Sequence, residues 1–238
     1  VRARGRGGHG SGLNPGSAPH ELIAGLSRLL ELPPRYHVTA PARRYFEALA
    51  PLHNEHWRAI FLDLDRAIAP DGPTVGLMPG MANWFLDTVQ VTVLDAGEQI
   101  NVIPEAATAR IDVRLLPDSD AEAFLARLRE ALGPELEVEV LLTAPPAPAS
   151  PTDNAFYRAI EAVLGREGPV VPAFIPGFTD SRYFRARGIP AYGLSPFALQ
   201  GPDLRGIHGP DERIPVAEFE AGVARTIRAV SRAISPAP

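Results

Sequence analysis

A proline-rich run at residues 144–151, Ala-Pro-Pro-Ala-Pro-Ala-Ser-Pro, constrains this chain more than any other feature. Proline fixes φ and lacks a backbone N–H, so the run favours a stiff, extended segment that cannot continue a helix. We therefore predict a linker at 144–151, with one domain at residues 1–143 and another at residues 152–238. With 238 residues, 45% of them hydrophobic, the chain can bury a core on each side of that linker.

The first domain alternates between strand and helix patterns. Apolar and β-branched alternation predicts strands at 1–6, 88–94, 107–116 and 136–142. Apolar residues at helical spacing predict one helix after Ser17 and another after Ser119-Asp120-Ala121-Glu122, which has the pattern of a capping box. The order β-α-β-β-α-β predicts an α+β, ferredoxin-like domain, in which two helices cover one face of a four-stranded antiparallel sheet. The irregular residues 33–87, with short helices near 43–50 and 57–69, are interpreted as an insertion.

The second domain has an α/β pattern. Helical spacing predicts helices beginning near Phe156, at 181–186 and at the end of the chain, and apolar runs predict strands at 169–175 and 191–194. Two strands in fewer than 90 residues are too few for a doubly wound domain, so we expect this part to complete a larger sheet. Because the chain opens on Val1 within a strand-like run, we also expect a fragment or a processed product.

Composition excludes several functional classes. The net charge is −5 and the arginines are scattered, which argues against a nucleic-acid partner. No cysteine is present, so a metal would have to be held by His, Asp or Glu. No apolar run approaches the length of a membrane span and no signal-peptide pattern opens the chain, so we predict no membrane partner and a cytoplasmic protein.

Two histidines lie where a ligand could reach them. His208 follows Ile207 in a Gly/Pro-rich turn ahead of the last helix, and it is either a metal ligand or a hydrogen-bonded loop residue. His9 lies among glycines at a strand end, and it either approaches a ligand or is a turn residue that tolerates positive φ. His53-Asn54-Glu55-His56 lacks the spacing of a helical zinc motif and is interpreted as surface helix.

Two further side chains could bind a substrate. Asn101, at the mouth of the predicted hairpin, could bind a carbonyl or carboxylate oxygen, or it could form an Asx-turn. Arg182, three residues after Thr179, could clamp a carboxylate or pair with Asp180. The residues alone leave these alternatives open.

Taken in order, four motifs resemble the zinc metallopeptidase family of aminoacylase, carboxypeptidase G, acetylornithine deacetylase and succinyl-diaminopimelate desuccinylase. They are Gly7-Gly8-His9-Gly10-Ser11; Asn101-Val102-Ile103-Pro104 with Asp112-Val113-Arg114; Gly177-x-Thr179-Asp180-x-Arg182; and Ile207-His208-Gly209-x-Asp211-Glu212. The resemblance covers nearly the whole chain except residues 33–87. In that family a β-α-β-β-α-β domain is inserted into the catalytic domain, acts as a lid and makes the dimer.

The resemblance implies roles for the two histidines. His208 matches a zinc ligand, and a complete active site of the family holds two Zn²⁺ ions. His9 matches the lid histidine that reaches the partner subunit's active site and stabilises the tetrahedral intermediate. The implied chemistry is attack of zinc-activated water on an amide carbonyl.

It also implies a substrate. Asn101 and Arg114 match substrate-binding lid residues, and Arg182, with Thr179 nearby, would hold a carboxylate. The expected partners are a small-molecule or short-peptide substrate with a free carboxylate and a second copy of the chain.

The family's other zinc ligands and its general-base glutamate have no counterpart in this sequence. We therefore expect an incomplete zinc-dependent hydrolase that is inactive alone. The alternative is a non-catalytic module that dimerises or binds small carboxylates.

Overall fold

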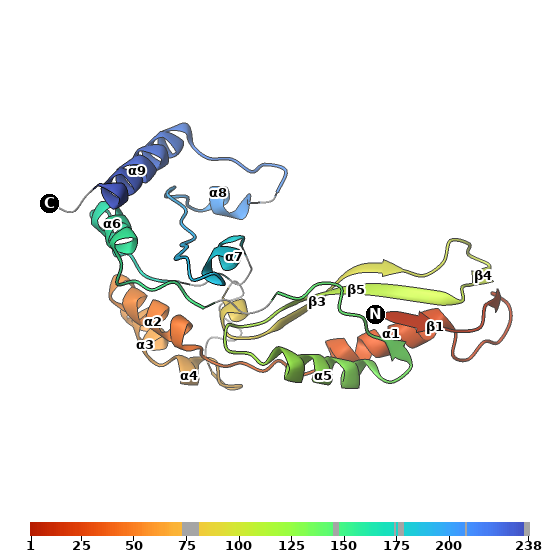
Figure 1. Cartoon of the computed structure of the whole chain (residues 1–238). Helices are drawn as coiled ribbons and strands as arrows, with labels where there is room; N and C mark the ends of the chain where they lie inside the picture. The colour runs from red at the N-terminus through yellow and green to blue at the C-terminus, as the bar shows by residue number, and fades with distance from the viewer. Residues whose placement is uncertain (73–80, 145–147, 174, 176–178, 208, 236–238) are drawn as a thin grey trace. The chain divides into compact units, whose positions relative to one another are not determined.

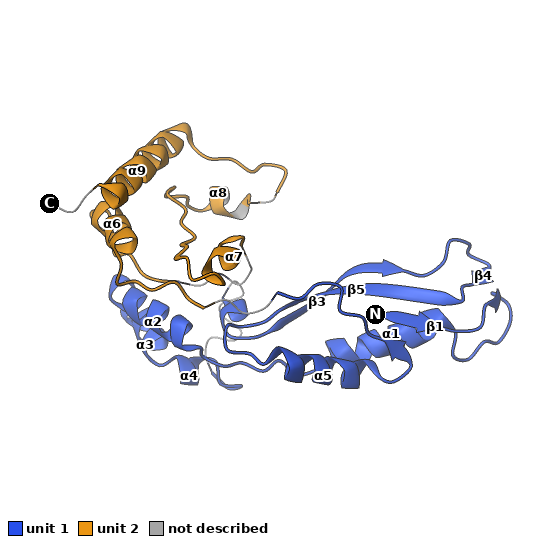
Figure 2. Ribbon diagram, viewed as in Figure 1, with its two compact units in different colours: residues 1–145, 173–177 blue, residues 146–172, 178–238 orange. Residues whose placement is uncertain are grey.

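The computed structural model describes residues 1–72, 81–144, 148–173, 175, 179–207 and 209–235 (Figure 1). The chain separates into two compact units (Figure 2). Unit 1 comprises residues 1–145 and 173–177, and unit 2 comprises residues 146–172 and 178–238.

Unit 1 contains a sheet, a short ribbon and two groups of helices (Figure 1). Its strands are β1 (Arg2–Arg4), β2 (Gly8–His9), β3 (Thr88–Asp95), β4 (Val102–Ile103), β5 (Ala106–Arg114) and β6 (Leu136–Glu137). Its α-helices are α1 (Ala18–Leu30), α2 (Ala40–Leu49), α3 (Glu55–Leu62), α4 (Leu64–Ala67) and α5 (Ala121–Leu132). Its 3-10 helices are η1 (Ala50–Leu52) and η2 (Ala82–Trp84).

The main sheet has four strands in the order β3-β5-β1-β6, and each neighbouring pair is antiparallel. The predicted four-stranded antiparallel sheet is thus confirmed. β3 and β5 pair along most of their length, with a bulge between Val91 and Val93. The strand predicted at 136–142 is only two residues long, because β6 pairs only with Arg2 and Ala3 of β1. The alternation of apolar and charged residues continues beyond the paired residues, so the pattern predicted a longer strand.

The core of unit 1 lies between this sheet and helices α1 and α5, which pack against each other (Figure 1). Small strand residues such as Ala107 and Ala109 let the helices approach closely. Gly25 of α1 marks the tightest point, since an added Cβ would lie 2.3 Å from Leu136 Cδ1 and 2.8 Å from the carbonyl oxygen of Leu132. The buried residues of this core are Ala3, Ala18, Leu22, Leu26, Leu29, Ala107, Ala109, Leu128, Leu132 and Leu136. Each buried leucine contributes about 1.5–3 kcal/mol.

The helix α5 is capped by Asp120, so the capping box predicted from Ser119 is wrong. The Asp120 carboxylate accepts hydrogen bonds from the backbone N–H groups of Glu122 and Ala123, at 2.9 and 3.0 Å. Ser119 instead donates its hydroxyl to Asp87 Oδ1 at 2.7 Å. Asp87 also accepts the N–H of Leu116, so it ties the segment after β5 to the start of β3 and removes Ser119 from the cap.

The residues predicted as an insertion form short helices with a core of their own. Phe46 is fully buried, and its ring centroid lies within 5.6 Å of those of four other aromatic side chains. The four are Tyr45, Phe61, Trp84 and Phe85. This cluster is separate from the core beneath the sheet, so α2 to α4 form a second small hydrophobic centre within unit 1.

The described residues of unit 2 contain helices α6 (Ala155–Leu164), α7 (Ser181–Arg185), α8 (Pro202–Arg205) and α9 (Val216–Ile234). The strands predicted at 169–175 and 191–194 do not form in the described parts of those ranges. A strand must pair its backbone groups with a neighbour. The N–H of Ala191 instead donates to Ser150 Oγ at 2.9 Å, and its carbonyl accepts that hydroxyl.

The long helix α9 packs against α6, and its buried positions are occupied by small residues while its large apolar residues are exposed. Gly222 and Ala229 are buried. One row of side chains, here called the α9 stripe, remains between 40% and 78% exposed. It consists of Val216, Phe219, Val223, Ile227, Val230 and Ile234.

Candidate active-site ribbon

Strands β2 and β4 form a two-stranded antiparallel ribbon, in which Gly8 pairs with Ile103 and His9 with Val102. A tight turn follows β2, closed by the N–H of Gly12 donating to the His9 carbonyl at 2.9 Å. A second turn precedes β4, closed by the N–H of Val102 donating to the carbonyl of Gln99 at 3.2 Å. These two turns lie at the same end of the ribbon.

A direct hydrogen bond joins the two turns. The N–H of Gly10 donates to the Asn101 carbonyl at 2.7 Å. A Cβ added to Gly10 would lie 3.3 Å from the carbonyl carbon and oxygen of Asn101, closer than almost all real contacts, so glycine permits this approach. His9 and Asn101 are far apart in the sequence, and the structure brings them side by side.

The side chain of His9 is exposed and is anchored within its own turn. Its Nδ1 atom lies 2.8 Å from Ser11 Oγ and accepts the backbone N–H of Ser11 at 3.2 Å. Asn101 is exposed as well. An imidazole and an amide, one on each of the two turns at the tip of the ribbon, can each bind an oxygen atom of a carbonyl or a carboxylate.

Arg114 lies at the opposite end of the sheet from this ribbon. It pairs with Thr88 at the end of β5, whereas β4 lies just before the start of that strand at Ala106. At a rise of about 3.3 Å per residue, Ala106 and Arg114 are about 26 Å apart. The Arg114 guanidinium donates two hydrogen bonds to Asp112, at 2.5 and 2.8 Å. The structure therefore does not bring Arg114 together with His9 and Asn101 within one chain.

In unit 2, Thr179 and Arg182 are neighbours at the start of α7. The N–H of Arg182 donates to the Thr179 carbonyl at 3.2 Å. The Arg182 guanidinium lies over the Tyr183 ring, 4.6 Å from its centroid, and donates to the Tyr183 hydroxyl at 2.6 Å. Carboxylate binding by Arg182 remains a prediction. His208 lies outside the described residues.

A family model for the peptidase dimerisation domain of M20 enzymes matches residues 1–139. The chain belongs to this M20 family. The resemblance inferred from the four motifs is thereby confirmed.

Two groups of curated M20 relatives are similar to this chain. Aminoacylase-1 from Homo sapiens is 34% identical over 151 residues, which cover 61% of this chain and 36% of that protein. The N-fatty-acyl-amino acid synthase/hydrolase PM20D1 from Xenopus tropicalis is 34% identical over 139 residues, which cover 56% of this chain and 27% of that protein. The chain thus matches about a third of the length of these relatives.

A solved M20 structure has a similar fold. The M20 family metallo-carboxypeptidase Sso-CP2 from Sulfolobus solfataricus aligns with a TM-score of 0.55 at 17% sequence identity. The alignment covers 98% of this chain and 56% of that one.

Metal binding is implied by the M20 relationship rather than by a cluster of side chains. Within the ranges that the structure describes, no group of three or more His, Asp or Glu residues could hold a metal ion. These residues do not by themselves fit a zinc centre, and the zinc ligand predicted at His208 is not among them. Across the same part of the chain, no helix is both long and apolar enough to cross a membrane.

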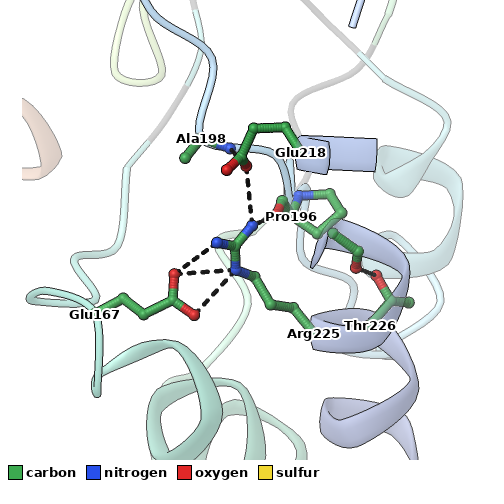
Figure 3. Close-up of polar contacts among 7 residues, drawn as sticks. Glu167, Pro196, Ala198, Glu218, Arg225 and Thr226 are labelled. Atoms are coloured by element: carbon green, nitrogen blue, oxygen red, sulfur yellow. Dashed lines mark hydrogen bonds and ion pairs between the residues drawn. The ribbon is translucent and has the colours of Figure 1, made fainter. Parts of the chain in front are cut away.

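Sequence reasoning missed a charge network in unit 2 (Figure 3). Arg225 of α9 donates to Glu167 at 3.0 Å, to Glu218 at 3.2 Å and to the Pro196 carbonyl at 2.9 Å. Glu218 also accepts the N–H of Ala198 at 3.0 Å. The seven-residue spacing of Glu218 and Arg225, which places them on one face of α9, was the available signal.

The network changes the proton affinities of its members. The hydrogen bond from Arg225 lowers the pKa of Glu167. The N–H of Ala198 and then Arg225 lower the pKa of Glu218, and both carboxylates raise the pKa of Arg225. All three groups are therefore charged at neutral pH, and they tie α9 to the segment after α6 and to residues 196–198.

Proposed function

We propose that this chain is the dimerisation domain and the C-terminal part of the catalytic domain of an M20 amide hydrolase. Residues 1–143 would be the lid, 144–151 the linker and 152–238 the catalytic part. The substrate would be a short peptide or an N-acyl amino acid with a free carboxylate. The observation that carries the proposal is the ribbon that holds His9 beside Asn101.

The lid assignment includes a ferredoxin-like topology. In chain order, α1 lies between β1 and β3, and α5 lies between β5 and β6. Together with the sheet order β3-β5-β1-β6, this is the arrangement expected for a β-α-β-β-α-β chain. The ribbon β2–β4 interrupts this pattern between β1 and α1 and between β3 and β5, where it extends the domain toward a substrate.

His9 and Asn101 are suited to stabilising an acyl oxygen. A ring N–H and an amide NH₂ both donate hydrogen bonds, and donors held in place before the reaction stabilise the charge that develops on that oxygen. The paired backbones of β2 and β4 supply the rigid support.

A homodimer reconciles the positions of these residues with a shared substrate. His9 and Asn101 lie on the ribbon next to the start of β5 at Ala106, whereas Arg114 lies about 26 Å further along that strand, which exceeds the length of a dipeptide-sized substrate. In a dimer, the His9–Asn101 pair of one subunit and Arg114 of the other could contact the same substrate. Among the described residues, β3 forms one edge of the sheet and carries exposed Val93 and Leu94, which suits a contact between subunits.

The α9 stripe supports the assignment of unit 2 to a larger catalytic domain. Exposed apolar side chains in one row along a helix mark an interaction face. The matched M20 relatives are longer than this chain, and the remainder of such a hydrolase is the surface that would cover the stripe.

The family relationship also leads us to propose that the hydrolase depends on zinc and that this chain is an incomplete part of it. When bound, zinc would activate water and polarise the scissile carbonyl. His208 would be one of its ligands. The described residues hold and orient the acyl group and the carboxylate.

The test measures zinc content, turnover of N-acyl amino acids and molar mass on one sample of the purified 238-residue chain. We expect little bound zinc, no turnover and a dimer of twice the 25.5 kDa chain mass. Two tightly bound zinc ions with turnover would contradict the incomplete-enzyme assignment, and a monomer at all concentrations would contradict the lid dimer.

A mutation tests the role of His9 in the intact hydrolase. Replacement of His9 by alanine should lower kcat by about 10²–10³-fold and keep the metal, because one oxyanion donor is lost. An unchanged kcat would remove His9 from the site.

A further inference from the structure

The turn after β2 forms hydrogen bonds with both the backbone and the imidazole of His9. Residues 9–12 are closed by the N–H of Gly12 donating to the His9 carbonyl at 2.9 Å. Within the turn, His9 Nδ1 lies 2.8 Å from Ser11 Oγ and 3.2 Å from the Ser11 nitrogen. One ring nitrogen therefore lies against two groups of the same residue.

These contacts determine which nitrogen of a neutral ring carries the proton. A backbone N–H can only donate, so Nδ1 must accept and has no hydrogen of its own in this geometry. The Ser11 hydroxyl can rotate to donate to the same lone pair. A neutral imidazole whose Nδ1 accepts carries its proton on Nε2. The opposite tautomer would place the Nδ1 hydrogen against the Ser11 N–H, donor facing donor.

We propose that Ser11 is a positioning residue that holds His9 in the Nε2–H tautomer and so presents a hydrogen-bond donor beside Asn101. The proposal rests on the proposed function and deepens it, because it gives neutral His9 the role of donor to an acyl or carboxylate oxygen. It excludes two other roles for Nε2 in this state, that of a general base and that of a metal ligand, since both require a free lone pair.

The neighbouring residues support a fixed donor. The ring is exposed, so Nε2–H is open to a ligand. The bond from Gly10 N–H to the Asn101 carbonyl fixes the two turns relative to each other. With both the backbone and Nδ1 of His9 bonded, the side chain has one anchored end and one donating end.

The tautomer can be read directly by NMR on the ¹⁵N-labelled 238-residue chain. Spectra that correlate ring nitrogens with ring carbon-bound protons are recorded under mildly alkaline conditions, and their nitrogen shifts distinguish the two neutral tautomers from the imidazolium. We expect His9 to show a protonated Nε2 and an unprotonated, hydrogen-bonded Nδ1. A mixture of tautomers, or a protonated Nδ1, would overturn the proposal.

Ser11→Ala removes the shorter of the two contacts and leaves the backbone N–H. Without the hydroxyl the imidazole keeps only the longer 3.2 Å contact and can rotate away from the Ser11 N–H. The ring nitrogens of His9 should then shift toward values averaged over both tautomers, and Ser11→Thr, which keeps a hydroxyl, should retain the original pattern. Ser27→Ala, which removes a surface hydroxyl from α1 that bonds Glu31, serves as the control and should leave His9 unchanged.

Identical His9 spectra in the wild-type chain and Ser11→Ala would contradict the role of Ser11. This experiment needs no turnover, so its failure would leave the amide-hydrolase proposal standing. Conversely, an inactive intact enzyme would leave the tautomer result standing.

Discussion

Units 1 and 2 bury their apolar residues in different ways. In unit 1, α1 and α5 place most of their leucines in the core beneath the sheet, and Leu132 has no exposed surface. In unit 2, α9 places Gly222 and Ala229 inward and leaves Ile227, in the middle of the α9 stripe, 60% exposed. Unit 1 therefore closes its core within itself, whereas α9 has a second face that is suited to another surface.

The comparison is tested most severely by matched truncations of one buried and one exposed side chain. Leu132→Ala should lower the free energy of unfolding by about 2–5 kcal/mol, because it opens a cavity in the core of unit 1. Ile227→Ala should change it by less than about 0.5 kcal/mol. Urea denaturation followed by circular dichroism measures both, and equal losses would show that the α9 stripe is buried in solution.

Two helical glycines sharpen the comparison at a smaller scale. Gly25→Ala should destabilise unit 1 by about 1–3 kcal/mol, because the new methyl group meets the backbone oxygen of Leu132. Gly222→Ala meets the ring of Phe197 at 2.3 Å, but that ring can move. The higher helix propensity of alanine, about 1 kcal/mol, should offset much of the clash. The unfolding midpoints of the two variants should therefore differ, and a loss at Gly222 as large as that at Gly25 would contradict this difference.

The smallest effect concerns the charge network of unit 2. The pKa values of Glu167 and Glu218 are lowered below the ordinary 4.5, so their ionised forms stabilise the folded state. That contribution is fully present above pH 4.5 and is lost as the pH falls through the lowered pKa values. Arg225→Gln should lower the thermal midpoint of unit 2 at neutral pH, and the difference from the wild-type chain should shrink in acid.

Arg232→Gln, in the exposed last turn of α9, is the matched control for Arg225→Gln. It should leave the midpoint unchanged at both pH values. A deficit in Arg225→Gln that persisted undiminished at about pH 3 would assign the effect to packing of the long side chain rather than to its charge.

The parts of unit 1 that were predictable are those with several turns or residues of regular pattern. The period-2 alternation at 88–94 and 107–116 and the helical period after Ser17 correspond to β3, β5 and α1. The two residues of β2 and the two of β4 are too short to show any alternation. The sequence therefore did not predict the adjacency of His9 and Asn101, which follows from the register of the ribbon.

The failures have local physical causes. The apolar runs at 169–175 and 191–194 predicted strands, because a sequence pattern cannot show whether a neighbouring strand is present to pair with. The Ser150 hydroxyl instead forms hydrogen bonds with the backbone N–H and carbonyl of Ala191. Ser119 was predicted to cap α5, but its hydroxyl donates to Asp87 instead. The network around Arg225 joins segments that are far apart in the sequence. The spacing of residues along α9 could indicate only the Arg225–Glu218 pair and not the bond to Glu167.

Hydrogen exchange of the purified 238-residue chain, read by mass spectrometry, tests the central contrast most directly. Amides of β5 and α5 should exchange only through the rare openings that expose the core of unit 1, whereas those of α9 should exchange through more frequent local openings. That result would support a dimerisation unit that folds on its own, joined to a catalytic part whose α9 stripe packs against the remainder of the hydrolase. Protection of α9 equal to that of β5 would contradict the account.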